Sequence, residues 1–195
     1  MGITQSLLMR LFGRPQGALG RLGGIIMARA NYACGVWVIE LLEVRPNDRV
    51  LEVGFGSGVV IQRVAAVAAC VAGVDLSQEM VEQARARNSG AVQSRRVELR
   101  RGSVESLPYD PNTFDASAGG QFISGLAECG RWIARNTPSY EANGRIALAF
   151  TPYSRQSKKG LMETFAIADF NRARIVDGDH GLSLLGSKPD FLKPR

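Results

Sequence analysis

Closely spaced glycines directly after a short apolar run constrain the fold of this chain more than any other feature. Residues 50–53 predict a buried strand and the residues after 57 predict a helix, so the run Gly-Phe-Gly-Ser-Gly joins the two. In such a loop Gly54 permits a tight turn, Gly56 lets a ligand approach the main chain, and Gly58 allows close packing of helix on strand. The segment therefore predicts a nucleoside-binding loop; a tight turn without a ligand is the alternative.

The spacing of the glycines distinguishes between cofactors. A dinucleotide fingerprint, G-x-G-x-x-G, requires glycine where Val59 stands, and a Walker-type loop requires a Gly-Lys-Ser/Thr sequence that does not follow. Asp75 ends the next predicted strand 17 residues beyond Gly58, near the distance at which an acidic side chain accepts hydrogen bonds from ribose hydroxyls. The alternative for Asp75 is a charge that stabilises the N-terminus of the following helix.

The rest of the chain alternates between predicted strands and helices, and this alternation sets the fold class. It predicts parallel strands with right-handed crossovers: a doubly wound, mostly parallel seven-stranded Rossmann-like α/β sheet with helices on both faces. Ligands of such sheets lie at the carboxyl ends of the strands. Strands are predicted at 50–53, 71–74, 97–99, near 114, 145–150, 173–176 and 181–185, and helices from 25 until Pro46, at 57–69, 77–88 and 158–168. Inward-facing positions are predicted at Ile26, Ala30, Ala33, Trp37 and Leu41 of the first helix and at Met80, Val81 and Ala84 of the third.

Composition limits the classes of protein that remain. With 195 residues, 45% of them hydrophobic, the chain can bury one core, predicted over residues 25–187 between a flexible leader (1–24) and a tail (188–195). Three cysteines without a C-x-x-C pair indicate a reducing, cytoplasmic compartment. A metal site is not expected, because His180 is the single histidine and is predicted to lie in a turn. No apolar run reaches the roughly 20 residues of a membrane span.

The net charge of +6 raises the question of a nucleic-acid partner. The densest basic cluster, formed by Arg95, Arg96, Arg100 and Arg101, flanks the predicted strand at 97–99. Basic residues on an edge strand prevent edge-to-edge pairing. We therefore predict an edge strand here and expect no nucleic-acid partner.

With Glu52 ahead of it, the glycine loop resembles motif I of the class I S-adenosylmethionine-dependent methyltransferases. Two further segments resemble small-molecule enzymes of the ubiquinone-biosynthesis type (methyltransferase domain 11). Residues 102–108, with Asn-Thr-Phe-Asp at 112–115, resemble the adenine-side loop and the start of strand four, and residues 144–152 resemble strand five and its exit. The resemblance covers roughly residues 25–187 and implies methyl transfer from S-adenosylmethionine to a small-molecule acceptor.

The resemblance also implies a set of cofactor-binding residues. Val104 would offer its backbone N–H to the adenine ring, and Ser103 stands where the family usually has an aspartate, which accepts stronger hydrogen bonds than a hydroxyl. No catalytic residue is assigned, because an in-line displacement gains much of its rate from alignment. In the first helix, Asn31, Tyr32 and Trp37 are candidates to cap the cofactor or acceptor, with core packing the alternative for the two aromatic residues. The complete implied set is Glu52, Gly54, Phe55, Gly56, Gly58, Asp75, Leu76, Ser103, Val104 and Gly120.

The resemblance breaks between strand four and strand five although the spacing of the flanking motifs is kept. Residues 116–121 have poor strand propensity, and Gly125 and Gly130 each cost a helix about 1 kcal/mol relative to alanine. The residues at 142–144, Ala-Asn-Gly, predict a turn before strand five, and Asp169 stands where relatives commonly have glycine. We hypothesise that two compensating frameshifts bracket roughly residues 116–142; ordinary divergence is the alternative.

Three function classes remain open at this stage. A methyltransferase acting on a small molecule is favoured, because neither Pro-Pro nor Pro-Cys, which mark enzymes acting on adenine and on cytosine C5, occurs in the chain. A cofactor-binding pseudoenzyme is motivated by the break at 116–142. A nicotinamide-dependent oxidoreductase is disfavoured by Val59. The acceptor is not identified, and a homodimer is left open.

Overall fold

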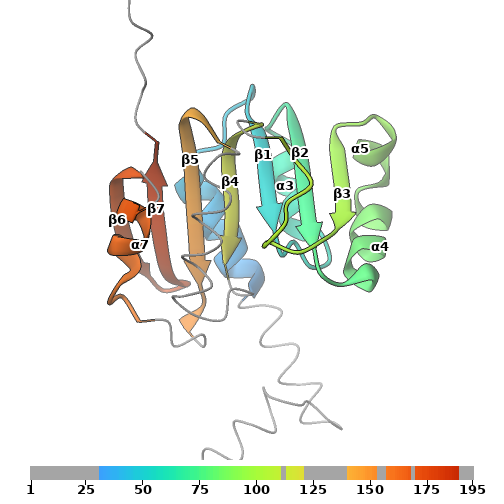
Figure 1. Cartoon of the computed structure of the whole chain (residues 1–195). Helices are drawn as coiled ribbons and strands as arrows, with labels where there is room; N and C mark the ends of the chain where they lie inside the picture. Colours follow the sequence, from blue (N-terminus) through green and yellow to red (C-terminus); the bar gives the residue numbers. More distant parts are fainter. Residues whose placement is uncertain (1–30, 111–112, 121–139, 153–156, 168–169, 189–195) are drawn as a thin grey trace, which may run out of the picture.

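The computed structural model describes residues 31–110, 113–120, 140–152, 157–167 and 170–188. One seven-stranded sheet with the order β3-β2-β1-β4-β5-β7-β6 crosses this part of the chain (Figure 1). Strands β1 to β5 pair in parallel, and β7 runs antiparallel to both β5 and β6. The predicted doubly wound, mostly parallel sheet is confirmed. Its strands are β1 (Arg49–Val53), β2 (Cys70–Asp75), β3 (Val97–Arg101), β4 (Phe114–Gly120), β5 (Tyr140–Phe150), β6 (Asn171–Gly178) and β7 (Gly181–Ser187).

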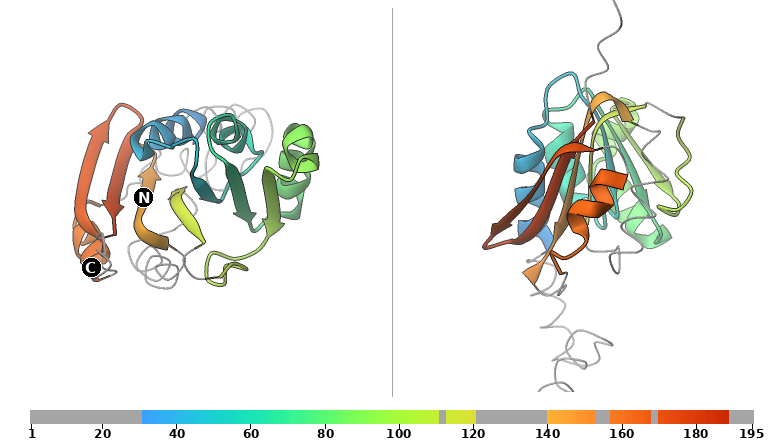
Figure 2. Two further views of the ribbon diagram at one scale, coloured as in Figure 1. Left: turned by 90° about the horizontal axis from the view of Figure 1, so that it is seen from above. Right: turned by 60° about the vertical axis from the view of Figure 1, so that its left-hand side comes forward.

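Helices cover both faces of the sheet. The leading helix, described over residues 31–42, and α3 lie on one face, and α7 lies on the other (Figure 2). Successive side chains of β5 point to opposite faces of the sheet. Ala147 and Ala149 join the core under the leading helix and α3, whereas Ile146, Leu148 and Phe150 join the core under α7. The described helices that have printed bounds are α3 (Val59–Ala65), α4 (Gln78–Arg87), α5 (Ser89–Gln93) and α7 (Leu161–Ile167). None of the described helices has the length and apolar character needed to cross a bilayer.

The leading helix packs on a face that lies one residue later than predicted. Its most buried side chains are Cys34, Val38 and Leu42, four residues apart, whereas Ala33 and Leu41 are only half-buried. Trp37 is also half-buried; its ring packs over Gly178 and makes an edge contact with His180. The large indole thus occupies the margin of the sheet, and smaller side chains face its centre. Ile26 and Ala30 lie outside the described residues.

Two predicted boundaries are wrong for reasons of backbone geometry. Helix α3 covers 59–65 instead of 57–69, because Gly58 is left-handed at its start and the chain turns at 66–69, where Ala69 N–H donates to Asp48 O. Strand β5 begins at Tyr140, so Asn143 and Gly144 lie inside a strand, at a register shift opposite β4, and not in a turn before it.

Strand β4 forms in the centre of the sheet despite its poor strand propensity. Ala116, Ser117 and Ala118 pair with both β1 and β5 and are at most 2% exposed. Because β4 lies between two strands, its backbone is hydrogen-bonded on both sides, and this pairing outweighs the poor strand propensity of its residues. Gly125, Gly130 and Asp169 lie outside the described residues, so the frameshift hypothesis stays a prediction.

The basic cluster lies at a sheet edge, as predicted, since β3 is the outermost strand on its side. Its side chains contact the protein itself: Arg96 donates to Ala65 O, and Arg101 donates to Leu76 O. Arg100 pairs with Glu98 and lies over the Tyr109 ring. These contacts support the edge-strand interpretation of the cluster.

An ion pair joins the amino end of β1 to β5. Asp48, just before β1, pairs with Arg145 of β5, and their side chains are only 7% and 17% exposed. Asp48 also accepts from Arg45 N–H at 2.6 Å, and Arg145 Nε donates to Leu42 O at 3.2 Å. The pair therefore ties the end of the leading helix to the sheet.

Removing this carboxylate is expected to destabilise the protein, because it leaves the guanidinium of Arg145 half-buried and unpaired. We predict that Asp48→Ala lowers the free energy of unfolding by about 3 kcal/mol in urea denaturation. The matched control is Asp177→Ala, which removes the ion pair between Asp177 and Lys158. The side chains of these two residues are each 58% exposed. This control should cost less than about 1 kcal/mol. Equal losses in the two variants would contradict the prediction.

Candidate functional site

The glycine loop passes from β1 to α3 through repeated left-handed backbone. Gly54, Gly56 and Gly58 have φ angles of 72°, 54° and 75°. Gly54 N–H donates to Val74 O at 2.8 Å, which holds the loop against the end of β2, and Gly58 N–H donates to Phe55 O at 3.1 Å. Only glycine adopts this conformation without strain, so the turn favours glycine at all three positions.

Two of these glycines serve different purposes. A Cβ on Gly58 would lie 2.6 Å from Ala84 Cβ and 2.9 Å from Ala84 Cα, and Asn88 Nδ2 donates to Gly58 O at 3.0 Å. The close contact is therefore between the loop and helix α4, not between helix and strand as predicted. A Cβ on Gly56 would meet nothing within 4 Å. Packing thus explains Gly58, whereas the space beside Gly56 is open to a ligand.

Asp75 lies directly behind the loop at the carboxyl end of β2. Its carboxylate is buried and accepts two backbone hydrogen bonds, from Gly56 N–H to Oδ2 and from Ser77 N–H to Oδ1, each at 2.9 Å. Ser77 in turn caps α4, since its hydroxyl accepts from Met80 N–H. Asp75 therefore orders both the glycine loop and the start of the next helix.

Glu52 is the most unusual group in this region. Its residue is only 8% exposed, and Oε2 has no hydrogen-bond partner among the residues that the structure describes. Burial, reinforced by the negative charge of Asp75, raises the pKa of Glu52 to about 8. A buried carboxyl without a partner is costly, and it is a common sign of a binding site.

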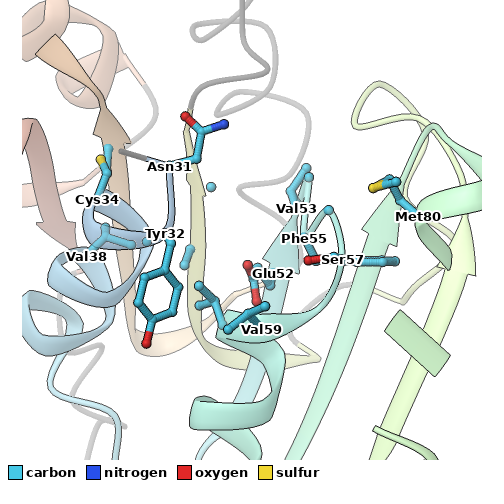
Figure 3. Close-up of a pocket in the computed structure, with 17 residues that line it drawn as sticks. Asn31, Tyr32, Cys34, Val38, Glu52, Val53, Phe55, Ser57, Val59 and Met80 are labelled. Carbon is cyan, nitrogen blue, oxygen red and sulfur yellow. The ribbon is translucent and has the colours of Figure 1, made fainter. Parts of the chain in front are cut away.

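Glu52 lies on the wall of a cavity of about 620 Å³, between the leading helix and the glycine loop (Figure 3). This volume falls within the roughly 300–1,000 Å³ of small-molecule sites. Apart from Glu52, the wall is largely apolar, and no Lys, Arg or His contributes to it within the described part of the chain. The wall is formed by Asn31, Tyr32, Cys34, Gly35 and Val38 of the leading helix, residues 52–57, Val59, Val60, Met80, Ala118, Gly119 and Ala149.

Tyr32 is held at the rim of the cavity by helix α3. The Tyr32 hydroxyl accepts from Arg63 Nε at 3.0 Å, and the guanidinium lies 5.5 Å from the ring centroid. Of the three candidates proposed in the leading helix, Asn31 and Tyr32 thus reach the cavity, whereas Trp37 does not line it.

The residues implied by the resemblance divide into two groups. Glu52, Gly54, Phe55 and Gly56 line the cavity. The Phe55 ring, however, belongs to the core: the residue is 5% exposed, and a Cβ on Gly73 would lie 2.7 Å from Phe55 Cδ1.

The second group, like Gly58 and Asp75, is not among the residues that line the cavity. Leu76 follows β2 with 67% of its surface exposed, and Ser103 and Val104 follow β3, half-buried. The Ser103 hydroxyl accepts from Glu105 N–H at 3.1 Å, so it already orders its own turn. Gly120 ends β4.

Several lining residues were not predicted: Cys34, Val38, Val60, Ala118 and Ala149 carry no motif. The helical spacing of Cys34 and Val38 was the available signal, and it was assigned one residue too early. The alanines come together only because β4 and β5 pair with Ala118 opposite Ala147.

Comparison with known proteins adds a family to this geometry. Residues 50–128 match the family described as methyltransferase domain. An uncharacterised methyltransferase of Bacillus subtilis, YdaC, is 27% identical over 163 residues, which cover 81% of this chain and 88% of the relative. The demethylmenaquinone methyltransferase of Symbiobacterium thermophilum is 31% identical over 122 residues, 60% of this chain and 49% of that protein. A structure of geranyl diphosphate C-methyltransferase from Streptomyces coelicolor has a TM-score of 0.67 at 14% identity, covering 90% of this chain and 87% of that one.

The sheet order and the glycine loop define a Rossmann-like fold of the methyltransferase kind. The domain match and the relatives specify it further: residues 50–128 match a methyltransferase domain, and the chain is similar to S-adenosylmethionine-dependent methyltransferases. The match extends to residue 128, whereas the motif resemblance breaks at residue 116. A pseudoenzyme is not favoured by these findings.

The packing role of Gly58 leads to a stability prediction. Gly58→Ala should lower the free energy of unfolding by about 1–3 kcal/mol, because the added Cβ meets the α4 backbone and the residue is left-handed. The matched control is Gly90→Ala in α5, where a Cβ meets nothing within 4 Å. That substitution should leave stability unchanged or raise it by up to about 1 kcal/mol. Denaturant titration compares the two, and an unaffected Gly58→Ala variant would refute the packing role.

The buried carboxyl leads to a pH prediction. Because the folded-state pKa of Glu52 is raised to about 8, folding favours the protonated form, and the wild type should lose stability as the pH rises from about 5 to about 8. The loss is at most about 1.4 kcal/mol per pH unit. Glu52→Gln keeps the shape and lacks the charge, so its stability relative to the wild type should rise across this window. Urea titrations without cofactor test this; parallel pH profiles would contradict it.

Proposed function

We propose that the cavity and the open space beside Gly56 bind S-adenosylmethionine, and that the methyl group passes to a small apolar acceptor. The observation that carries the proposal is the unpaired Glu52 carboxyl, buried in an otherwise apolar wall next to a glycine loop. Such a carboxyl suits a cationic ligand, because a positive charge removes the cost of burying the negative one.

The residues beside the loop fit the other parts of the cofactor. Asp75 uses one lone pair on each oxygen for backbone N–H groups, and a carboxylate has about four such sites, so ribose hydroxyls can still donate to it. Leu76, 67% exposed, offers an apolar surface next to it for an adenine ring. Ser103 and Val104, on the neighbouring loop, would supply polar contacts to the ring edge, and Gly54, Phe55, Gly58 and Gly120 would contribute backbone.

When bound, S-adenosylmethionine supplies a methyl group on a positively charged sulfur, with a neutral thioether as leaving group. The chain has to align the acceptor with that methyl and keep water out. Val38, Val60, Ala118 and Ala149 provide apolar walls for both tasks, and Tyr32, tied to Arg63, bounds the rim. These residues orient the acceptor and exclude water; none is required as a nucleophile.

The apolar lining also supports the acceptor class. Apart from Glu52, polar groups on the wall are few, and they come from Asn31, Tyr32 and Ser57. A small molecule with an apolar body fits this wall better than a charged polymer does. Relatives named for demethylmenaquinone and for geranyl diphosphate agree with a small-molecule acceptor.

Cofactor binding should be visible as protection against heating. At a concentration 100 times its dissociation constant, S-adenosylmethionine or its demethylated product should add about 2.7 kcal/mol of stability. A nicotinamide dinucleotide at the same concentration is the matched control and should add none. Protection by the dinucleotide alone would overturn the proposal. Turnover is then measured as demethylated product formed with a panel of apolar hydroxyl, amine and carbon acceptors.

Gly56 provides a test of the binding surface. Gly56→Ala should keep the fold, because its Cβ meets no atom within 4 Å and only the left-handed conformation is penalised. Its affinity for S-adenosylmethionine should nevertheless fall more than about tenfold, because the methyl group occupies space that the ligand needs. Gly90→Ala, at a position that does not line the cavity, should bind as the wild type does. Calorimetric titration measures both; unchanged affinity in Gly56→Ala would place the ligand elsewhere.

A further inference from the structure

We propose that cofactor exchange in this protein is coupled to proton exchange at Glu52: the carboxyl is protonated in the empty cavity and releases its proton to solvent when the cationic end of the cofactor enters. This inference rests on the proposed function and deepens it. The cofactor would arrive with a positive charge, the proton would leave with one, and the net charge of the buried site would stay constant.

The charges around Glu52 support a protonated empty state. On β2, the neighbouring Asp75 is itself a carboxylate, already engaged with two backbone N–H groups. On the leading helix, burial raises the pKa of Cys34 to about 11, so its thiol is neutral, and Tyr32 is bonded to Arg63 of α3. The lining residues of β4 and β5, Ala118, Gly119 and Ala149, carry no charge.

No cation from the described residues therefore balances Glu52. Its Oε2 is without a hydrogen-bond partner, and its residue is 8% exposed, so water compensates little. Burial and the charge of Asp75 raise the pKa of Glu52 to about 8, which agrees with the geometry. A neutral carboxyl at this point costs less than a bare carboxylate, and only an incoming cation reverses that preference.

The coupling has a defined sign. The ionised form binds the cation, so affinity for S-adenosylmethionine should rise with pH, by up to about tenfold per unit, and level off near the pKa of about 8. Methyl transfer removes the positive charge of the sulfonium. If the sulfonium is the partner of Glu52, the carboxylate then takes up a proton again and the product is held less tightly; if the ammonium is the partner, the carboxylate stays ionised until the product leaves.

Calorimetry in two buffers with different ionisation enthalpies measures the protons released on binding. We expect the wild type to release close to one proton per S-adenosylmethionine near pH 7, and Glu52→Gln to release only what the titration of the ligand itself accounts for. Glu40→Gln, which changes an exposed carboxyl on the leading helix, is the matched control and should behave as the wild type. Titration with the demethylated product identifies the partner: equal release indicates the ammonium, and smaller release the sulfonium, and both outcomes support the coupling.

The coupling would be overturned if wild type and Glu52→Gln bound with the same proton release and the same pH dependence. A uniform loss of affinity at all pH values in Glu52→Gln would likewise overturn it and leave a purely structural role. Absence of binding in the wild type would instead refute the proposed function. Infrared spectroscopy of the wild type gives a readout that needs no variant: the C=O stretch of a protonated carboxyl should disappear when S-adenosylmethionine is added below about pH 7. Its persistence would contradict the proposal.

Discussion

The left-handed turn at 54–58 sets the geometry of the site, because it lets β1 pass into α3 directly beside the end of β2. Three features meet there: the positive φ angles of Gly54, Gly56 and Gly58, the hydrogen bond from Gly54 N–H to Val74 O, and the Asp75 carboxylate on Gly56 N–H. A side chain at Gly58 would push α4 away, and one at Gly56 would enter the space left for a ligand. The same backbone thus connects β1 to α3 and forms part of the surface open to a ligand.

Burial of two acidic side chains next to this turn gives the site its electrostatic character. Asp75 is stabilised by backbone donors, so it is a satisfied charge within the fold. Glu52, one strand away, has no such partner on Oε2 and faces an apolar cavity. The unsatisfied carboxyl is therefore the group that a cationic cofactor can control.

Much of the fold could be predicted because buried parallel strands carry near-continuous apolar runs, as β1 and β2 do. Gly54, Gly56 and Asp75 are predicted from spacing and Glu52 from the resemblance to motif I, since the loop chemistry depends on residues close together in the sequence. The errors came from packing: the predicted inward face of the leading helix lies one residue too early, and the close contact of Gly58 is with α4 and not with a strand. Both contacts depend on which distant segment of the chain packs against the residue, and local sequence does not encode that.

The sequence by itself determined the fold class, the left-handed glycine turn and the acidic residues at the ends of the first two strands, because these follow from short-range sterics and from periodicity. Only the tertiary structure decided that the leading helix forms one wall of a cavity and that alanines of β4 and β5 line it. It also decided that Glu52 faces that cavity without a cation among the described residues. The physical reason is that cavity shape and desolvation depend on residues far apart in the chain, brought together by strand order and helix packing.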